Sequence, residues 1–149
     1  MRTTKAFIFI TVLMATTACQ EFDGLSHELE YQACYEEKNW NYDKLKKKMV
    51  GTWFHEFTRI SWSPDIEDNR ELNRTLELRE DGIYILWQDT VEITRETWDI
   101  QESLSNPPTF TMTSNSIWFE GKWVYLCDDI LVLTDAPLDG ATEYYRKVD

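Results

Sequence analysis

The chain has 149 residues, which predicts a single domain because domains average roughly 100 to 200 residues. Hydrophobic residues make up 42% and aromatic residues 14%, so the chain can bury a core. Asp and Glu outnumber Lys and Arg by 27 to 15, a formal charge of -12. Because non-specific nucleic-acid binding depends on positive charge, this balance excludes nucleic acid from the expected partners.

The first 18 residues are typical of an export signal. Arg2 and Lys5 precede an apolar run over 6–15, which has the length of a signal peptide's hydrophobic region. The run is too short to span a bilayer, which needs about 20 residues. We therefore expect residues 1–18 to be removed and the mature protein to reach the cell envelope.

Small residues over 15–18 stand immediately before Cys19, and this pattern resembles the lipobox of bacterial lipoproteins in the relaxed form of Bacteroidota. The resemblance implies that Cys19 carries lipid such as palmitate and anchors the protein to the membrane. The expected location is the periplasmic or surface face of the outer membrane. The alternative is ordinary signal-peptidase cleavage after Ala18, which leaves Cys19 as a free thiol.

Residues 19–42 are polar and acidic, with scattered aromatics and no sustained helical or strand period. We interpret them as a tether with at most one helix. Cys34 and Cys127 remain, in a compartment where disulfides persist. The sequence leaves two states open: a disulfide that docks the tether beside the end of a strand, or two unpaired cysteines.

From Asp43, an N-cap residue, the pattern indicates a short helix that ends at Gly51. Strands follow near 51–61, 73–80, 83–93, 96–102, 109–113, 117–127, 130–134 and 142–148. Asp81-Gly82 is the strongest hairpin signal among them. We predict an all-β domain over 43–149: a small eight-stranded antiparallel up-and-down barrel with a short N-terminal helical segment.

The Gly51-x-Trp53 motif after a short helix, the hairpin over 76–84 and the ending over 143–148 resemble bacterial lipocalin-like lipoproteins. This resemblance implies a lipocalin-like (calycin) barrel. It also implies that Trp53 closes one barrel end and that Arg146 lies across its ring, a cation over an indole face. The barrel is shorter than a typical lipocalin, which limits the size of any ligand.

The expected ligand is small and apolar or amphipathic, because aromatic residues are plentiful and Trp and Tyr can pack and still hydrogen-bond. If strand alternation holds, His55 shares a face with Trp53 and Phe57. A purely structural histidine is the alternative for His55. The candidate contacts are His55, Phe57, Trp87, Trp98, Trp123 and Tyr125.

Catalysis is not expected, because the sequence offers no nucleophile with a positioned base. No cofactor or metal is expected either. The alternative function is a protein-binding module, for example an envelope immunity or inhibitor lipoprotein with an acidic, aromatic surface. Trp118 and Phe119 are adjacent, so one of them should face outward in a strand. The free volume inside the barrel would distinguish the two functions.

Overall fold

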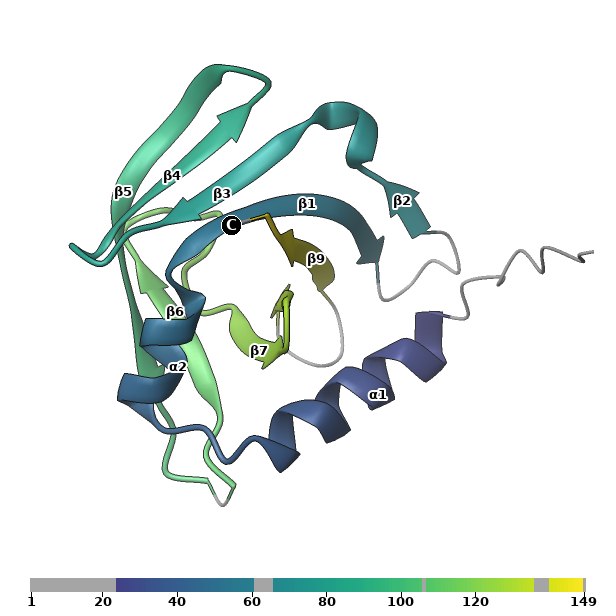
Figure 1. Ribbon diagram of the computed structural model, residues 1–149, viewed down its shortest axis with the longest axis vertical. Helices are drawn as coiled ribbons and strands as arrows, with labels where there is room; N and C mark the ends of the chain where they lie inside the picture. Colours follow the sequence, from purple (N-terminus) through teal and green to yellow (C-terminus); the bar gives the residue numbers. More distant parts are fainter. Residues whose placement is uncertain (1–23, 61–65, 106, 136–139, 149) are drawn as a thin grey trace, which may run out of the picture.

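The computed structural model describes residues 24–60, 66–105, 107–135 and 140–148 (Figure 1). The expected signal over 1–18 and the lipidation residue Cys19 lie outside this part of the chain. The described helical elements are α1 (Gly24–Glu37), α2 (Tyr42–Met49) and the 3-10 turn η1 (Arg70–Leu72). The described strands are β1 (Gly51–Ile60), β2 (Ile66–Asp68), β3 (Arg74–Leu78), β4 (Ile83–Gln88), β5 (Val91–Glu102), β6 (Phe110–Ser114), β7 (Trp123–Cys127), β8 (Ile130–Thr134) and β9 (Ala141–Lys147).

A closed antiparallel barrel is the centre of the fold. The strands pair in the order β1-β3-β4-β5-β6-β7-β8-β9, and β9 pairs with β1 to close the ring. From β3 onward, each strand pairs with the strand that follows it in the sequence, as in an up-and-down barrel. The short strand β2 pairs with three residues in the second half of β1, outside this order. The predicted fold class is therefore confirmed.

Three predicted strands have different limits in the structure. The segment expected as one strand over 83–93 turns at Asp89, which adopts a φ of 55°, so β5 begins earlier than predicted. The segment expected over 117–127 becomes a strand only at Trp123. Before it, Gly121 has a φ of 75° and its N–H donates to the Met112 carbonyl, which holds a tight turn there.

Alternate residues of the barrel strands point inward and form one hydrophobic core. Each of the largest inward side chains is at most 4% exposed. They are Trp53, Leu76, Leu78, Tyr84, Trp98, Ile100, Phe110, Met112, Val124, Leu126, Leu131 and Leu133. Burial at roughly 1.5–3 kcal/mol for each large apolar side chain makes this core the main stabilising contribution.

Helix α2 closes one end of the barrel. Its two inward residues, Leu45 and Met49, are fully buried, and the Met49 carbonyl accepts a hydrogen bond from Trp53 Nε1 at 2.7 Å. The N-cap is Asn41, whose side chain accepts from the Lys44 N–H at 2.9 Å, so the helix begins earlier than the cap predicted at Asp43.

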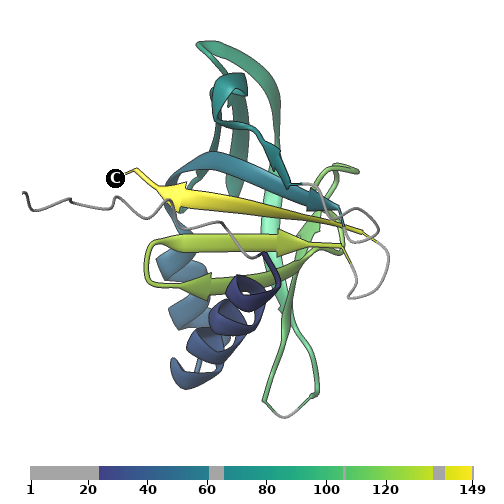
Figure 2. The ribbon, with the colours of Figure 1, turned by 90° about the vertical axis from the view of Figure 1, so that its right-hand side faces the viewer.

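Helix α1 lies on the outside of the barrel beside β7, with β8 and β9 next along the sheet (Figure 2). A disulfide joins Cys34 to Cys127 at the end of β7, with a Cα–Cα distance of 5.8 Å. Tyr35 is 4% exposed and its ring meets the edge of Tyr125. The helix has no amphipathic pattern, so tertiary contacts and the bridge hold it in place.

The predicted contact between Arg146 and Trp53 is wrong. Lys147 takes that place: its Nζ lies 5.1 Å from the Trp53 ring centre, whereas Arg146 pairs with Glu56 at 2.7 Å on the outer surface. The register explains the difference, because Lys147 pairs with Trp53 and Arg146 pairs with Phe54. Neighbouring residues of one strand face opposite sides of the sheet.

Among the described residues, no helix is both long enough and apolar enough to span a membrane.

Candidate functional site

The interior of the barrel differs between its two ends. The half next to α2 is filled by Trp53, Trp98 and their apolar neighbours. The opposite end, called the mouth here, receives titratable side chains from several strands. We define the mouth cluster as His55, Arg74, Lys122, Glu143 and Tyr145.

Strand register brings these side chains together. Trp53 pairs with Leu76, and His55 and Arg74 lie one inward step further from α2 on the same two strands. Tyr145 is the cross-strand partner of His55. Because inward positions alternate along each strand, all three side chains project into the barrel beyond the apolar layer.

Stacking and hydrogen bonds connect the cluster across β1, β9 and the start of β7. The His55 and Tyr145 rings stack with their centres 4.8 Å apart, and the Tyr145 hydroxyl donates to Glu143 Oε2 at 2.8 Å. Lys122 Nζ lies 3.0 Å from Asp135 Oδ1 and 3.8 Å from Glu143 Oε1. The Asp135 side chain is 49% exposed, so the cluster extends from the buried interior to water.

His55 also contacts a hydroxyl. Its Nε2 lies 3.1 Å from Thr58 Oγ1, which accepts a hydrogen bond from the Asn69 amide at 2.7 Å. A hydroxyl oxygen can accept two hydrogen bonds and donate one, so either His55 or Thr58 can be the donor in this contact. Both His55 and Asn69 are buried, so this is a fixed interior network.

Burial and the neighbouring charges set the protonation of the cluster. Desolvation, with the positive charge of Arg74 next in importance, lowers the pKa of His55 to about 4. Desolvation also raises the pKa of Glu143, which the nearby Lys122 opposes. The pKa of the Tyr145 hydroxyl is raised well above its ordinary value by burial and by Glu143. At neutral pH His55 and Tyr145 are therefore both uncharged.

The lowered pKa of His55 makes its imidazole a weak general base at neutral pH. A general base works best when its pKa lies near the working pH, and the pKa of His55 is about 4. The Thr58 hydroxyl is consequently poorly activated, even though it contacts the imidazole. Uncharged donors, a guanidinium and an ammonium group inside an apolar wall can instead orient a polar group of a bound molecule.

Of the predicted ligand contacts, His55 lies in the mouth cluster. Trp98 is inside the barrel but in its filled half, where its Nε1 donates to the Arg79 carbonyl at 3.2 Å. Trp87 pairs with Thr75 and Trp123 pairs with Thr134, which are outward positions. Trp87 and Trp123 are therefore on the outer surface and do not line the interior.

Phe57 does not share a face with His55, which corrects the prediction from strand alternation. The pairing of β1 with β9 shifts between these two residues, so His55 faces Tyr145 whereas Phe57 faces Tyr144. The Phe57 and Tyr144 rings stack at 4.3 Å. A bulge at Glu56 adds one residue to β1 and reverses the side on which Phe57 lies.

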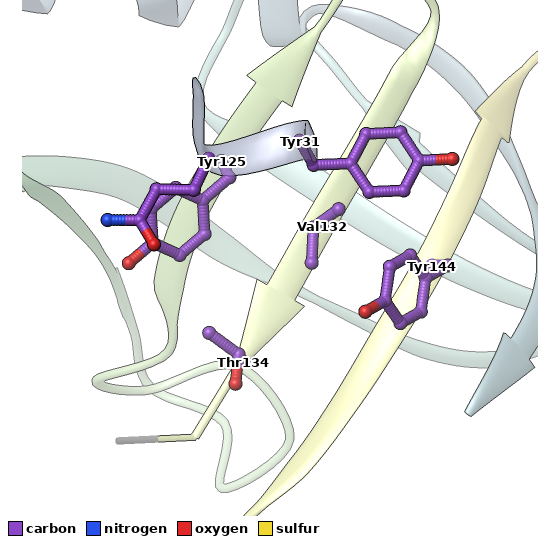
Figure 3. Close-up of a pocket in the computed structure, with 6 residues that line it drawn as sticks. Tyr31, Tyr125, Val132, Thr134 and Tyr144 are labelled. Carbon is purple, nitrogen blue, oxygen red and sulfur yellow. The ribbon is translucent and has the colours of Figure 1, made fainter. Parts of the chain in front are cut away.

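Tyr125 lies on the outer face under α1. Together with Tyr31, Val132 and Tyr144 it lines a cavity of about 40 Å³ between the helix and the sheet (Figure 3). A cavity of this size holds a few water molecules, since one water needs roughly 10–15 Å³ by the same measure. Tyr125 therefore packs the helix against the barrel rather than lining the interior.

Four members of the mouth cluster were not predicted: Arg74, Lys122, Glu143 and Tyr145. Inward positions of neighbouring strands could have indicated two of them, since Arg74 keeps the alternation of Leu76 and Tyr145 pairs with His55. Glu143 has the same inward alternation as Tyr145 but is a charged residue expected outside. Lys122 lies in a turn before β7, where alternation gives no information.

In the described part of the chain, the side chains of Cys34, Cys127 and Asp128 form a group of potential metal ligands that lie close together. Its two sulfur atoms are already joined to each other in the disulfide.

Comparison with protein-family models, with curated proteins and with solved structures gives no match for this chain.

Proposed function

We propose that this protein binds a small, partly apolar ligand in the mouth of its barrel, does no catalysis, and is held in a bacterial envelope by lipid on Cys19. The observation that carries the binding proposal is the polar mouth cluster inside a barrel whose other end is filled and closed by α2. A ligand would reach the cluster from the end opposite α2.

The energetics of the cluster support this proposal. The Lys122 side chain is 7% exposed, and a buried charge costs several kcal/mol unless it is well paired. Apolar side chains of similar volume would give this barrel a core at least as stable. Titratable groups with perturbed pKa values are common at functional sites, so a ligand would account for residues that stability alone does not require.

Fluorescence titration with 1-aminoanthracene tests the proposal. Thr94 faces inward because it pairs with Leu86, whereas Thr75 faces outward beside Trp87. Thr94→Trp should therefore fill the approach to the mouth and weaken probe binding by tenfold or more, and the matched control Thr75→Trp should not. Equal affinity in both variants, or no binding by the wild type, would contradict the proposal.

A second candidate function is supported by one surface feature. In the turn before β7, Ile117 is 92% exposed and Trp118 is 53% exposed, whereas Phe119 is buried against the Tyr84 ring. Adjacent exposed apolar side chains of this kind suit a protein partner. If such a partner exists, Trp118→Ser should abolish its recovery with the purified protein, and Leu104→Ser, at a separate exposed site, should leave it unchanged.

A further inference from the structure

Arg74 differs from the other arginines around the barrel. Its side chain is half-buried and inward, and its Nε donates to Gln88 Oε1 at 3.4 Å. It forms no ion pair with any residue that the structure describes. By contrast, four other arginines each pair with a nearby carboxylate: Arg70, Arg79, Arg95 and Arg146.

The remaining charges of the mouth cluster are already paired. Lys122 lies between Asp135 and Glu143, and Glu143 accepts a hydrogen bond from the Tyr145 hydroxyl. Arg74 is the next inward position after Leu76 on β3, beside the inward position of His55 on β1, so its charge lies next to the cluster. The guanidinium is thus the cation of the mouth cluster whose hydrogen-bonding capacity is largely unused.

We propose that the mouth binds its ligand by a carboxylate, which forms paired hydrogen bonds with Arg74. This inference rests on the proposed function and names the chemical class of its ligand. Guanidinium and carboxylate groups match in a planar, bidentate geometry, and such bonds are stronger than those between neutral groups.

The charges around Arg74 favour a ligand with a single negative charge. One carboxylate neutralises Arg74, whereas a phosphate dianion would bring a second negative charge into a barrel that already holds the inward carboxyl groups of Glu143 and Glu96. A cationic head group would meet Arg74 and Lys122 at short range. A neutral head group would leave the Arg74 guanidinium partly desolvated without an anion, which is unfavourable.

Calorimetric titration with octanoate, 1-octanol and octylamine at pH 7.5 tests the assignment. The wild type should bind octanoate at least about tenfold more tightly than 1-octanol, as expected for charged hydrogen bonds, and should bind octylamine most weakly. Arg74→Gln should lose the preference for octanoate, and Arg74→Lys should keep part of it. The matched control Arg79→Gln, which removes an outward arginine of the same segment, should behave as the wild type.

The outcomes separate this inference from the proposed function. If the wild type binds octanoate and 1-octanol equally, or prefers octylamine, the carboxylate assignment is wrong whether or not Arg74→Gln folds. If Arg74→Gln folds and keeps the preference, Arg74 is not the anchor. If 1-aminoanthracene binds and Thr94→Trp blocks it while octanoate shows no preference, the binding function stands and this inference falls. Failure of every probe would overturn both.

Discussion

Single residues at the closed end of the barrel show how much depends on strand register. Trp53 is fully buried and bonds to the last turn of α2, and Lys147 covers its ring. The resemblance assigned the cation over the Trp53 ring to Arg146, but the structure places the next residue, Lys147, at this position. A shift of one position moves a side chain to the other face of the sheet, so sequence alone could not choose between the two.

Truncation should rank these residues by their burial. Trp53→Ala should lower the free energy of unfolding by roughly 3–5 kcal/mol, as expected for a large aromatic lost from a packed core. Lys147→Ala should cost about 1 kcal/mol through its cation–π contact. Arg146→Ala should cost about 0.5 kcal/mol, because its ion pair is on the surface. Urea denaturation measures all three, and a larger loss for Arg146 than for Lys147 would contradict the assignment.

The pKa of His55 predicts a pH dependence of stability. His55 has a pKa of about 4 when folded and an ordinary value near 6.5 when unfolded, so the unfolded chain binds more protons between these limits. Stability should therefore fall as the pH drops from 6.5 to 4, by on the order of 3 kcal/mol at most.

His55→Gln should lose this part of the pH dependence. The raised pKa of Glu143 has the opposite effect, because it makes stability fall as the pH rises. Glu143 is present in both proteins, so the difference between their stability curves isolates the contribution of His55. Urea midpoints measured from pH 4 to 8 give the curves. Parallel curves would show that His55 ionises normally in the folded protein.

At the level of elements, the strands were largely predictable and the site was not. Alternation in β3 and the Asp81-Gly82 turn indicated antiparallel pairs, and five of the eight predicted strands keep their approximate places. The bulge at Glu56 and the inward Glu143 depend on pairing between distant strands, which no local pattern contains. For that reason His55 was found from the sequence, whereas its partners in the mouth cluster were not.

We expect helix α1 to depend on the Cys34–Cys127 disulfide more than the barrel does. The bridge closes a loop with a sequence separation of 93 residues, and removing such a link costs roughly 4 kcal/mol by chain entropy. In the Cys34→Ser, Cys127→Ser double variant, amides of α1 should exchange hydrogen much faster, with those of β7 and β8 less affected. Unchanged protection of α1 would show that packing by Tyr35 holds the helix without the bridge.

For the whole molecule, charge and attachment are linked. Removal of residues 1–18 would delete two cations and leave 13 basic against 27 acidic residues, a charge of -14. Anionic lipid surfaces repel such a body, so stable membrane attachment would require a lipid on the chain itself. The proposed envelope location therefore depends on Cys19.

Cys19→Ser should move the protein from the membrane fraction to the soluble fraction and abolish incorporation of labelled palmitate. The barrel should be unaffected, because Cys19 precedes the described helices and strands. Cys34→Ser serves as the control, since Cys34 is in the disulfide and should leave labelling unchanged. Continued membrane fractionation of the Cys19 variant would contradict lipid anchoring.

Ligand binding in the mouth is the central claim, and NMR mapping tests it most directly. Titration of isotope-labelled protein with 1-aminoanthracene should shift the backbone amides of His55, Arg74 and Tyr145 and leave those around Tyr31 and Tyr125, at the outer cavity, unchanged. Shifts confined to the outer cavity under α1, or no shifts at saturating probe, would contradict the account.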